Sequence, residues 1–112
     1  RSGQKINLIL ADSHSSRTFD SVKSILKNNK IDFLFIDGDH TYDGVKRDFF
    51  MYKELVADQA IIMFHDIAPH WNPIYGVENF WKEIKKQYKN IEFVKDYDGC
   101  GRGLGLVLLD RK

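Results

Sequence analysis

Short apolar runs alternate with amphipathic stretches along the chain. Residues 33–36 and 60–64 are continuous apolar runs without polar alternation, a pattern typical of strands covered on both faces. Residues 6–10 are rich in β-forming side chains and predict an earlier strand. Residues 91–94 and 104–109 are two later runs with no helical pattern between them, and they predict an antiparallel hairpin at one edge of the sheet.

Apolar residues also recur at helical spacing in three stretches between these runs. The second stretch begins near Asp43, and the first ends near Asn28, in a Lys-Asn segment that favours a helix end. Because strands alternate with helices, the predicted class is α/β, with a mostly parallel sheet and helices on both faces. The residues that mark the three apolar helix faces are Phe19, Val22, Ile25 and Leu26; Val45, Phe49, Tyr52 and Val56; and Val77, Phe80, Trp81, Ile84 and Tyr88.

The composition is that of one globular domain. The 112 residues include 43% hydrophobic and 29% charged side chains, which excludes a disordered or fibrous chain. Seventeen Lys and Arg against sixteen Asp and Glu give a net charge of +1, so no overall field attracts nucleic acid or an anionic membrane. We therefore expect neither a nucleic acid nor a membrane as a partner.

The single cysteine and the first residues bear on location and completeness. Cys100 has no second cysteine for an internal disulfide, which favours a reducing, cytoplasmic setting. No apolar run approaches the ~20 residues of a membrane helix, so we expect a soluble protein. Residues 1–4 include neither an initiator Met nor a signal peptide, so residues 1–112 are interpreted as one partial domain cut from a longer chain.

Polar and ionisable side chains follow three of the apolar runs directly. In parallel sheets, ligands bind at the carboxyl ends of the strands, so these side chains are expected to converge on one rim. Each residue alone is equally well explained as a turn former or helix cap. The side chains are Asp12, Ser13 and His14 after the first run, Asp37, Asp39 and His40 after the second, and His65 and Asp66 after the third.

Clustered carboxylates and imidazoles indicate a site for a cation. Like charges at adjacent strand ends repel unless a divalent cation or a cationic ligand lies between them. Asp37 and Asp66 are the best oxygen ligands, and His65 or Asp39 could complete the set around Mg²⁺. His40 carries the side chain that titrates near neutral pH and is a candidate general base, with a surface or helix-capping histidine as the alternative.

Three other features have weaker chemical interpretations. The glycine-rich stretch at residues 99–105 precedes a predicted strand instead of opening a helix, which favours a turn over a phosphate-binding loop. Trp71 follows the third run closely and either lines a pocket or packs on the domain surface. Cys100 lacks an assignable base, so nucleophilic catalysis is not expected.

Two motifs together resemble a known family. The stretch IDGDHTYDGVKRD at residues 36–48 and the FHDI motif at residues 64–67 resemble class I S-adenosylmethionine-dependent methyltransferases. The branch they resemble most is the small-molecule O-methyltransferases related to macrolide sugar methyltransferases and the cephalosporin-hydroxylase-like group, with catechol O-methyltransferase more distant. The resemblance runs from Ile6 to Leu109, but it covers only the C-terminal half of that family's Rossmann-like fold.

The family's first two strand-helix units have no counterpart in this chain. In the family they include the glycine-rich cofactor loop and the acid that binds the ribose, and their strands lie between those that match residues 6–10 and 33–36. The resemblance thus implies a gap in the sheet, direct pairing of the two flanking strands, or strands supplied from elsewhere. We expect direct pairing or a partner chain, because an open edge within a core invites aggregation.

The resemblance also implies roles for individual residues. Asp12, Ser13 and Asp37 match cofactor-binding positions, the first two at the adenine. Asp37, His65 and Asp66 match the metal site of the metal-dependent members, although an acid or amide is more usual at the position of His65. His40 matches the general base of the sugar-methylating members.

The implied function is methyl transfer from S-adenosylmethionine to a hydroxyl of a small molecule, with Mg²⁺ as the metal. We expect the isolated chain to be inactive, because half of the cofactor site is missing, and homodimerisation is compatible with the family. Two alternatives remain open: a non-catalytic binding or assembly module, and a metal-dependent hydrolase or hydroxylase. The sequence spacing does not predict the two-histidine-plus-carboxylate set that the latter enzymes use.

Overall fold

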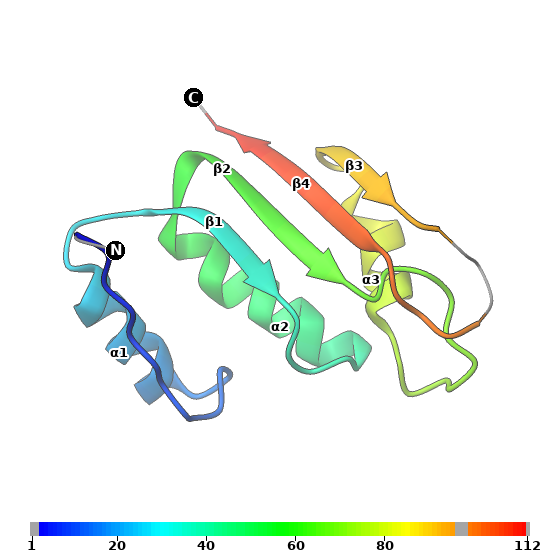
Figure 1. The fold of residues 1–112 in the computed structure, drawn as a ribbon, viewed down its shortest axis with the longest axis horizontal. Helices are drawn as coiled ribbons and strands as arrows, with labels where there is room; N and C mark the ends of the chain where they lie inside the picture. The colour runs from blue at the N-terminus through cyan, green and yellow to red at the C-terminus, as the bar shows by residue number, and fades with distance from the viewer. Residues whose placement is uncertain (1–2, 96–98, 112) are drawn as a thin grey trace.

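A computed structural model describes residues 3–95 and 99–111. Arg1 and Ser2, which belong to the segment that we interpreted as a cut from a longer chain, lie outside the described residues. Helices and strands alternate through most of the chain, as predicted (Figure 1). In order, the elements are α1 (Ser16–Leu26), β1 (Ile31–Ile36), α2 (Tyr42–Tyr52), the 3₁₀ turn η1 (Lys53–Leu55), β2 (Val56–His65), α3 (Val77–Ile84), β3 (Lys89–Phe93) and β4 (Leu104–Asp110).

The four strands form one mixed sheet in the order β1-β2-β4-β3. β1 and β2 are parallel, whereas β4 runs antiparallel to both β2 and β3. The predicted α/β class and the antiparallel final pair are confirmed. The expectation of a mostly parallel sheet is wrong, because the last strand inserts between β2 and β3 instead of adding at the edge.

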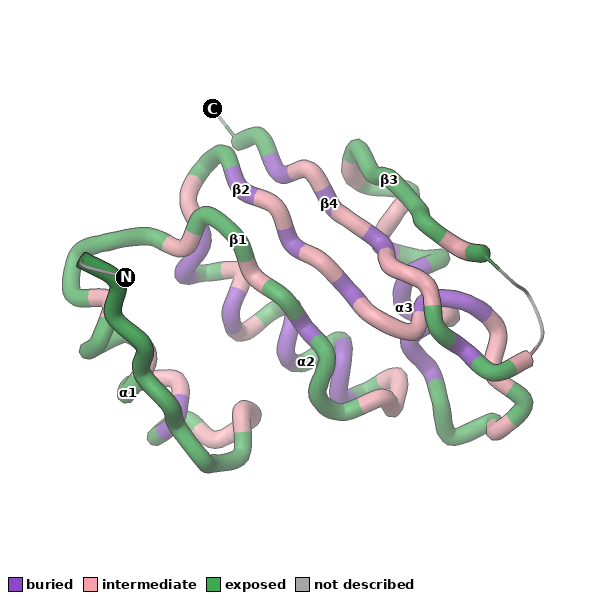
Figure 2. The backbone as a smooth tube through the Cα atoms, viewed as in Figure 1, coloured by how far each residue is buried: buried purple, intermediate pink, exposed green. Residues whose placement is uncertain are grey.

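One face of the sheet carries the core. Phe64 on β2 is fully buried, and its ring centroid lies 5.7 Å from that of Phe49 on α2 and 5.7 Å from that of Trp81 on α3. Phe80 on α3 contacts both Phe49 and Phe64. Helices α2 and α3 therefore cover the same face, where alternate residues of β2 and β4 are buried (Figure 2).

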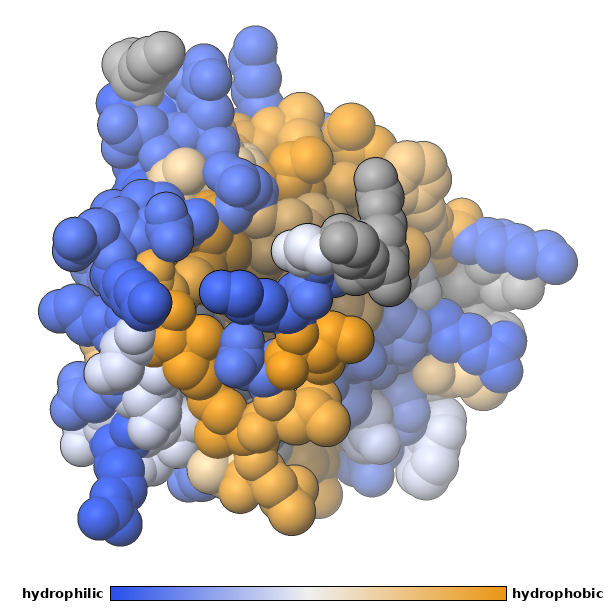
Figure 3. Space-filling view, turned by 60° about the vertical axis from the view of Figure 1, so that its left-hand side comes forward, coloured by the Kyte–Doolittle hydropathy of each residue, from blue (hydrophilic) through white to orange (hydrophobic). Residues whose placement is uncertain are grey.

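The opposite face of the sheet lacks a covering helix within the described part of the chain. Phe33 and Phe35 on β1 are 51% and 46% exposed, and Ile91 and Phe93 on β3 are also exposed. Apolar side chains gather at the centre of the molecular surface in Figure 3, with polar side chains around them. The expectation of helices on both faces is therefore wrong for these residues, and an uninterrupted apolar run did not mean a strand buried on both sides.

Residues 6–10 do not form a strand. They are exposed, and Leu8 and Leu10 are almost fully so. No neighbouring strand accepts their backbone hydrogen bonds, so a strand does not form here. The segment lies over α1, and α1 packs on α2 through Phe19, whose ring lies 5.6 Å from that of Tyr52 (Figure 1). We expected either direct pairing of residues 6–10 with β1 or completion of the sheet by a partner chain. Direct pairing is wrong in this structure, and the partner chain stays a prediction.

Local polar contacts explain where α1 and α2 begin. The Ser15 hydroxyl accepts a hydrogen bond from the backbone N–H of Arg17, and the Thr41 hydroxyl accepts one from that of Gly44. Each contact satisfies a helix N–H that has no partner within the helix. None of the helices within residues 3–95 and 99–111 has the length and apolar character needed to cross a membrane.

Gly105 allows the last strand to approach α3 closely. A Cβ atom built on Gly105 would lie 2.8 Å from three ring atoms of Trp81. Trp81 is buried and donates a hydrogen bond from Nε1 to the Glu92 carboxylate on β3, with an N···O distance of 2.6 Å. The missing side chain at Gly105 thus makes room for the largest residue of the core.

Candidate functional site

Four ionisable side chains converge at the carboxyl ends of the two parallel strands. Asp37 follows β1, His40 precedes α2, His65 is the last residue of β2, and Asp66 comes next. Each offers one ligand atom, and these atoms lie within 4.8 Å of one another. The predicted convergence of these residues on one rim is therefore confirmed.

The distances within this cluster are those of ion pairs. His40 Nε2 lies 2.7 Å from Asp66 Oδ2 and 3.3 Å from Asp37 Oδ1. His65 Nδ1 lies 3.0 Å from Asp66 Oδ2 and 3.5 Å from Asp37 Oδ1. Both imidazole nitrogens thus face the same two carboxylates, and two histidines come together with carboxylates in a way that the sequence spacing did not predict.

Neither of these two nitrogens has a hydrogen-bond partner in the described structure. His40 Nε2 and His65 Nδ1 are shielded from solvent, and the nearby carboxylate oxygens do not lie in hydrogen-bonding geometry. Shielded polar atoms without a partner are costly and call for an explanation. A divalent cation held by Asp37, His65 and Asp66 would give His65 Nδ1 a partner and would leave His40 Nε2 free to meet a substrate group, so the residues present fit a metal ion.

The glycine-rich loop at residues 99–103 holds Asp66 in place. The backbone N–H of Arg102 donates to Asp66 Oδ1 at 2.8 Å, which leaves Oδ2 directed at the two histidines. The N–H of Asp66 donates to the Gly103 carbonyl, and Asp66 itself has a left-handed backbone with φ 67°. Asp tolerates this conformation better than most residues. The loop is a turn with close backbone packing, as predicted, and its contact with the site is not visible in the sequence.

The loop between β2 and α3 holds His40. The Tyr75 ring stacks on the His40 ring at a centroid distance of 5.3 Å and on the His70 ring at 3.8 Å. The N–H of Gly76 donates to the His40 carbonyl at 2.7 Å. The sequence analysis did not identify Tyr75, because nothing in its spacing marks it.

Asp39 does not join the cluster. Its Oδ1 accepts hydrogen bonds from the N–H and the hydroxyl of Thr41, and these two bonds lower the pKa of the Asp39 carboxyl. A Cβ atom on Gly44 would overlap the Asp39 carboxylate, so Gly44 is needed for this turn. The idea that Asp39 completes the metal site is wrong in this structure; Asp39 forms the turn that leads into α2.

The predicted adenine-binding loop is fixed to α2 by a buried carboxylate. Asp48 is 5% exposed, and its Oδ1 accepts a hydrogen bond from the Ser13 hydroxyl at 2.7 Å and lies 3.2 Å from His14 Nε2. The Tyr52 hydroxyl donates to the Ser13 carbonyl. The sequence analysis gave His14 no role and did not identify Asp48. Asp48 lies in α2 next to residues of the apolar helix face, so the helical pattern does not mark it as a site residue.

A cavity of about 220 Å³ lies between this loop and β1. Its lining includes Ser13 of the loop, Asp37 of the cluster and the neighbouring Gly38. Asp12 lies outside this lining, with its carboxylate exposed and its Oδ1 bonded to the N–H of His14. Of the three predicted cofactor residues, the structure thus brings Ser13 and Asp37 to one cavity.

A family model described as a methyltransferase domain matches residues 2–67, more than half of the chain. The chain belongs to the methyltransferase domain family. The resemblance to class I S-adenosylmethionine-dependent methyltransferases is thereby confirmed. The matched residues include Asp12 and Ser13, which were predicted to contact adenine, and all four residues of the cluster.

Two curated relatives of this methyltransferase-family chain are much longer than it is. Uncharacterized protein y4gI of Sinorhizobium fredii is 25% identical over 91 residues, which cover 81% of this chain and 9% of the relative. Uncharacterized protein R132 of Acanthamoeba polyphaga mimivirus is 46% identical over 46 residues, which cover 40% of this chain and 21% of the relative. The chain therefore spans less than a quarter of either relative.

A solved structure also aligns with this chain. The crystal structure of the O-methyltransferase from Bacillus cereus in complex with SAH is 17% identical. The alignment covers 80% of this chain and 46% of that protein, with a TM-score of 0.47.

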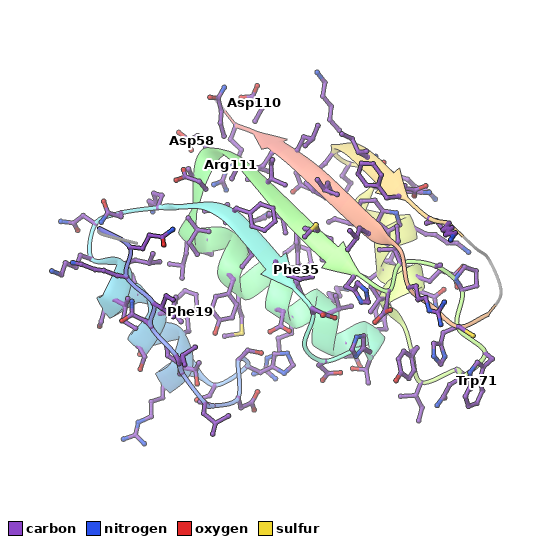
Figure 4. The ribbon with its side chains drawn as sticks, viewed as in Figure 1. Phe19, Phe35, Asp58, Trp71, Asp110 and Arg111 are labelled. Atoms are coloured by element: carbon purple, nitrogen blue, oxygen red, sulfur yellow. The ribbon has the colours of Figure 1, made fainter. Side chains whose placement is uncertain are left out.

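Trp71 and Cys100 stand apart from the cluster. Trp71 is 75% exposed and its ring stacks on that of His70 at the molecular surface. Figure 4 shows Trp71 at the opposite end of the molecule from Asp58 and Arg111. Cys100 is exposed, and its backbone forms an isolated bridge with His70.

Proposed function

We propose that this chain carries the catalytic rim of an S-adenosylmethionine-dependent O-methyltransferase that acts on a hydroxyl group of a small molecule. The observation that supports this most is the cluster of Asp37, His40, His65 and Asp66 at the carboxyl ends of β1 and β2. This is where open α/β sheets bind their ligands. Ser13 of the predicted adenine loop and Asp37 of the cluster also line one cavity.

The proposed reaction transfers a methyl group in line from a sulfonium to a hydroxyl oxygen. The C–S bond breaks, a C–O bond forms, and the hydroxyl proton passes to His40 Nε2. A divalent cation held by Asp37, His65 and Asp66 would orient the substrate hydroxyl and make it more acidic. Methyl transfer depends chiefly on holding the two reacting atoms close and aligned.

The surroundings of His40 suit a general base. The ring is held from one side by Tyr75, and its Nε2 faces Asp66 Oδ2 at 2.7 Å. The two carboxylates stabilise the positive charge that the ring acquires when it takes the proton. A positioned base of this kind contributes about 10²- to 10⁴-fold to the rate.

Binding of S-adenosylmethionine is the first test. Calorimetric titration of this chain, with and without Mg²⁺, is expected to show weak binding or none, and the same titration on a longer chain that includes the preceding residues is expected to give a micromolar constant. Absence of binding in the longer chain would contradict the proposal.

Activity of the longer chain is the second test. Asp37→Ala is expected to abolish metal-dependent methyl transfer to a hydroxyl acceptor, and His40→Gln to lower kcat by about 10²-fold or more. His70→Asn is the matched control, since His70 lies outside the cluster. Full turnover by a His40→Ala, Asp66→Ala double variant would instead favour a non-catalytic module.

A further inference from the structure

The cluster differs from an all-oxygen magnesium site in its donor atoms. Mg²⁺ demands oxygen ligands in near-octahedral geometry and keeps several of its waters. Imidazole nitrogen suits Zn²⁺, Fe²⁺, Ni²⁺ and their neighbours, and affinity for such mixed sites rises along the first-row series. In this chain the predicted ligand set contains the imidazole of His65 in addition to the carboxylates of Asp37 and Asp66.

The fold holds His65 as a ligand and not as a mobile surface residue. His65 is the last residue of β2, where it pairs with Leu104 of β4. Its neighbour Asp66 is bonded to two backbone groups of the glycine-rich loop. The strand and the loop therefore fix the backbone at His65 and Asp66 before any metal binds, which reduces the ordering cost of binding.

The orientation of the ring directs one nitrogen into the cluster. His65 Nδ1 is shielded from solvent, has no hydrogen-bond partner and lies 3.0 Å from Asp66 Oδ2 and 3.5 Å from Asp37 Oδ1. In a site without metal this shielded nitrogen has lost its bond to water and has no hydrogen bond in its place. A metal ion that accepts nitrogen donors removes this cost, whereas Mg²⁺ removes it poorly.

We propose that this cluster selects a first-row transition ion of the series from Mn²⁺ to Zn²⁺ over Mg²⁺, with His65 Nδ1 as the ligand that sets the preference. The inference shares the metal site of the proposed function but does not depend on methyl transfer. The family resemblance implies Mg²⁺, whereas the donor atoms of this chain favour a first-row transition ion.

Direct metal titration of this chain tests the inference without any enzyme activity. Co²⁺, Mn²⁺ and Mg²⁺ are each titrated calorimetrically, and Co²⁺ binding is also followed by its visible absorption, which changes when nitrogen replaces oxygen as a ligand. Co²⁺ and Mn²⁺ are expected to bind at least about tenfold more tightly than Mg²⁺. Equal or tighter binding of Mg²⁺ would overturn the inference and leave the proposed methyl transfer intact.

Two variants identify the ligand. His65→Asp makes the predicted set all-oxygen, and it is expected to lower the Co²⁺-to-Mg²⁺ affinity ratio about tenfold or more and to shift the Co²⁺ absorption. His70→Asn is the matched control and is expected to keep both the ratio and the absorption of the unmodified chain. An unchanged ratio in His65→Asp, with circular dichroism showing an intact fold, would overturn the role of His65. Failure of all three ions to bind the unmodified chain would overturn the inference and the metal part of the proposed function together.

Discussion

The two faces of the sheet differ more than any other two regions of the molecule. The face that carries Phe64 is covered by α2 and α3, whereas the face that carries Phe35 is half exposed, although both faces are built from the same apolar strands. Within the described residues, every large, fully buried side chain belongs to the covered side or to the helices that cover it. Stability is therefore concentrated on one face, and the other face is left as apolar surface.

The largest expected effect comes from truncating one aromatic residue on each face. Phe64→Ala removes a ring packed against three other aromatic rings and is expected to lower the free energy of unfolding by about 3 to 5 kcal/mol. Phe35→Ala is the matched control on the open face and is expected to cost less than about 1.5 kcal/mol. Urea unfolding measures both, and equal losses would contradict the contrast between the faces.

Adding one carbon atom to the covered face gives the next largest effect. Gly105→Ala would bring a Cβ atom to 2.8 Å from the Trp81 ring, so it is expected to destabilise the fold by about 1 to 3 kcal/mol. Gly38→Ala is the control, because its Cβ would meet only the Asp48 carboxylate, at 3.7 Å. Thermal unfolding of the two variants should separate them, and a neutral Gly105→Ala would show that α3 shifts easily.

The open face is expected to bind a hydrophobic dye. A Phe33→Ser, Phe35→Ser double variant should reduce the fluorescence of bound anilinonaphthalene sulfonate, because it removes two aromatic rings that are about half exposed. Trp71→Ser removes a more exposed ring from a loop outside the sheet and should change the signal less. A larger loss in Trp71→Ser would place the dye away from the open face.

The smallest effect lies at the polar edge of the covered face. Lys85 and the Trp81 N–H both contact Glu92 Oε1, and these contacts lower the pKa of the Glu92 carboxyl, with the Lys85 contact the larger cause. A carboxyl whose folded-state pKa is lowered stabilises the fold above its ordinary pKa, and this contribution is lost as the pH falls through the folded-state value.

Glu92→Gln is therefore expected to cost about 1 kcal/mol or less at pH 7. Urea midpoints of the two proteins measured down to pH 3 should converge as the pH falls. Lys82→Gln, which breaks an exposed i,i+4 pair with Glu78 on α3, is the control and should change the midpoint less. A difference between Glu92→Gln and the unmodified chain that grows in acid would contradict this assignment of the pKa shift.

Most of the fold could be predicted from periodicity, and the failures have one cause. The helical spacing of Val45, Phe49 and Tyr52 and the apolar run of β2 led to the right elements, because both patterns reflect burial against neighbours within this chain. Residues 6–10 have strand-forming side chains, yet a strand also requires a partner for its backbone, and propensity does not supply one. For the same reason the apolar run of β1 did not reveal which of its faces would be covered.

The candidate site could be predicted only in part. Asp37, His40, His65 and Asp66 lie at or just after the carboxyl ends of β1 and β2, so the topology brings them together. Asp48 and the Arg102 N–H act from a helix and from a glycine-rich loop, and their contacts depend on tertiary packing that no local pattern records.

The place of β4 in the sheet has a consequence for synthesis on the ribosome. β4 is the last of the described strands in sequence but lies between β2 and β3. Its pairs with β2 join residues from 39 positions apart (His65 with Leu104) to 51 positions apart (Gln59 with Asp110). Until Leu104–Asp110 leave the exit tunnel, one edge of β2 is unpaired. Glu92 on β3 and Trp81 on α3 then have no neighbouring strand that joins them to the sheet. A nascent chain at that stage exposes an open, apolar strand, so chaperone binding should rise once β2 has emerged and fall once β4 has emerged.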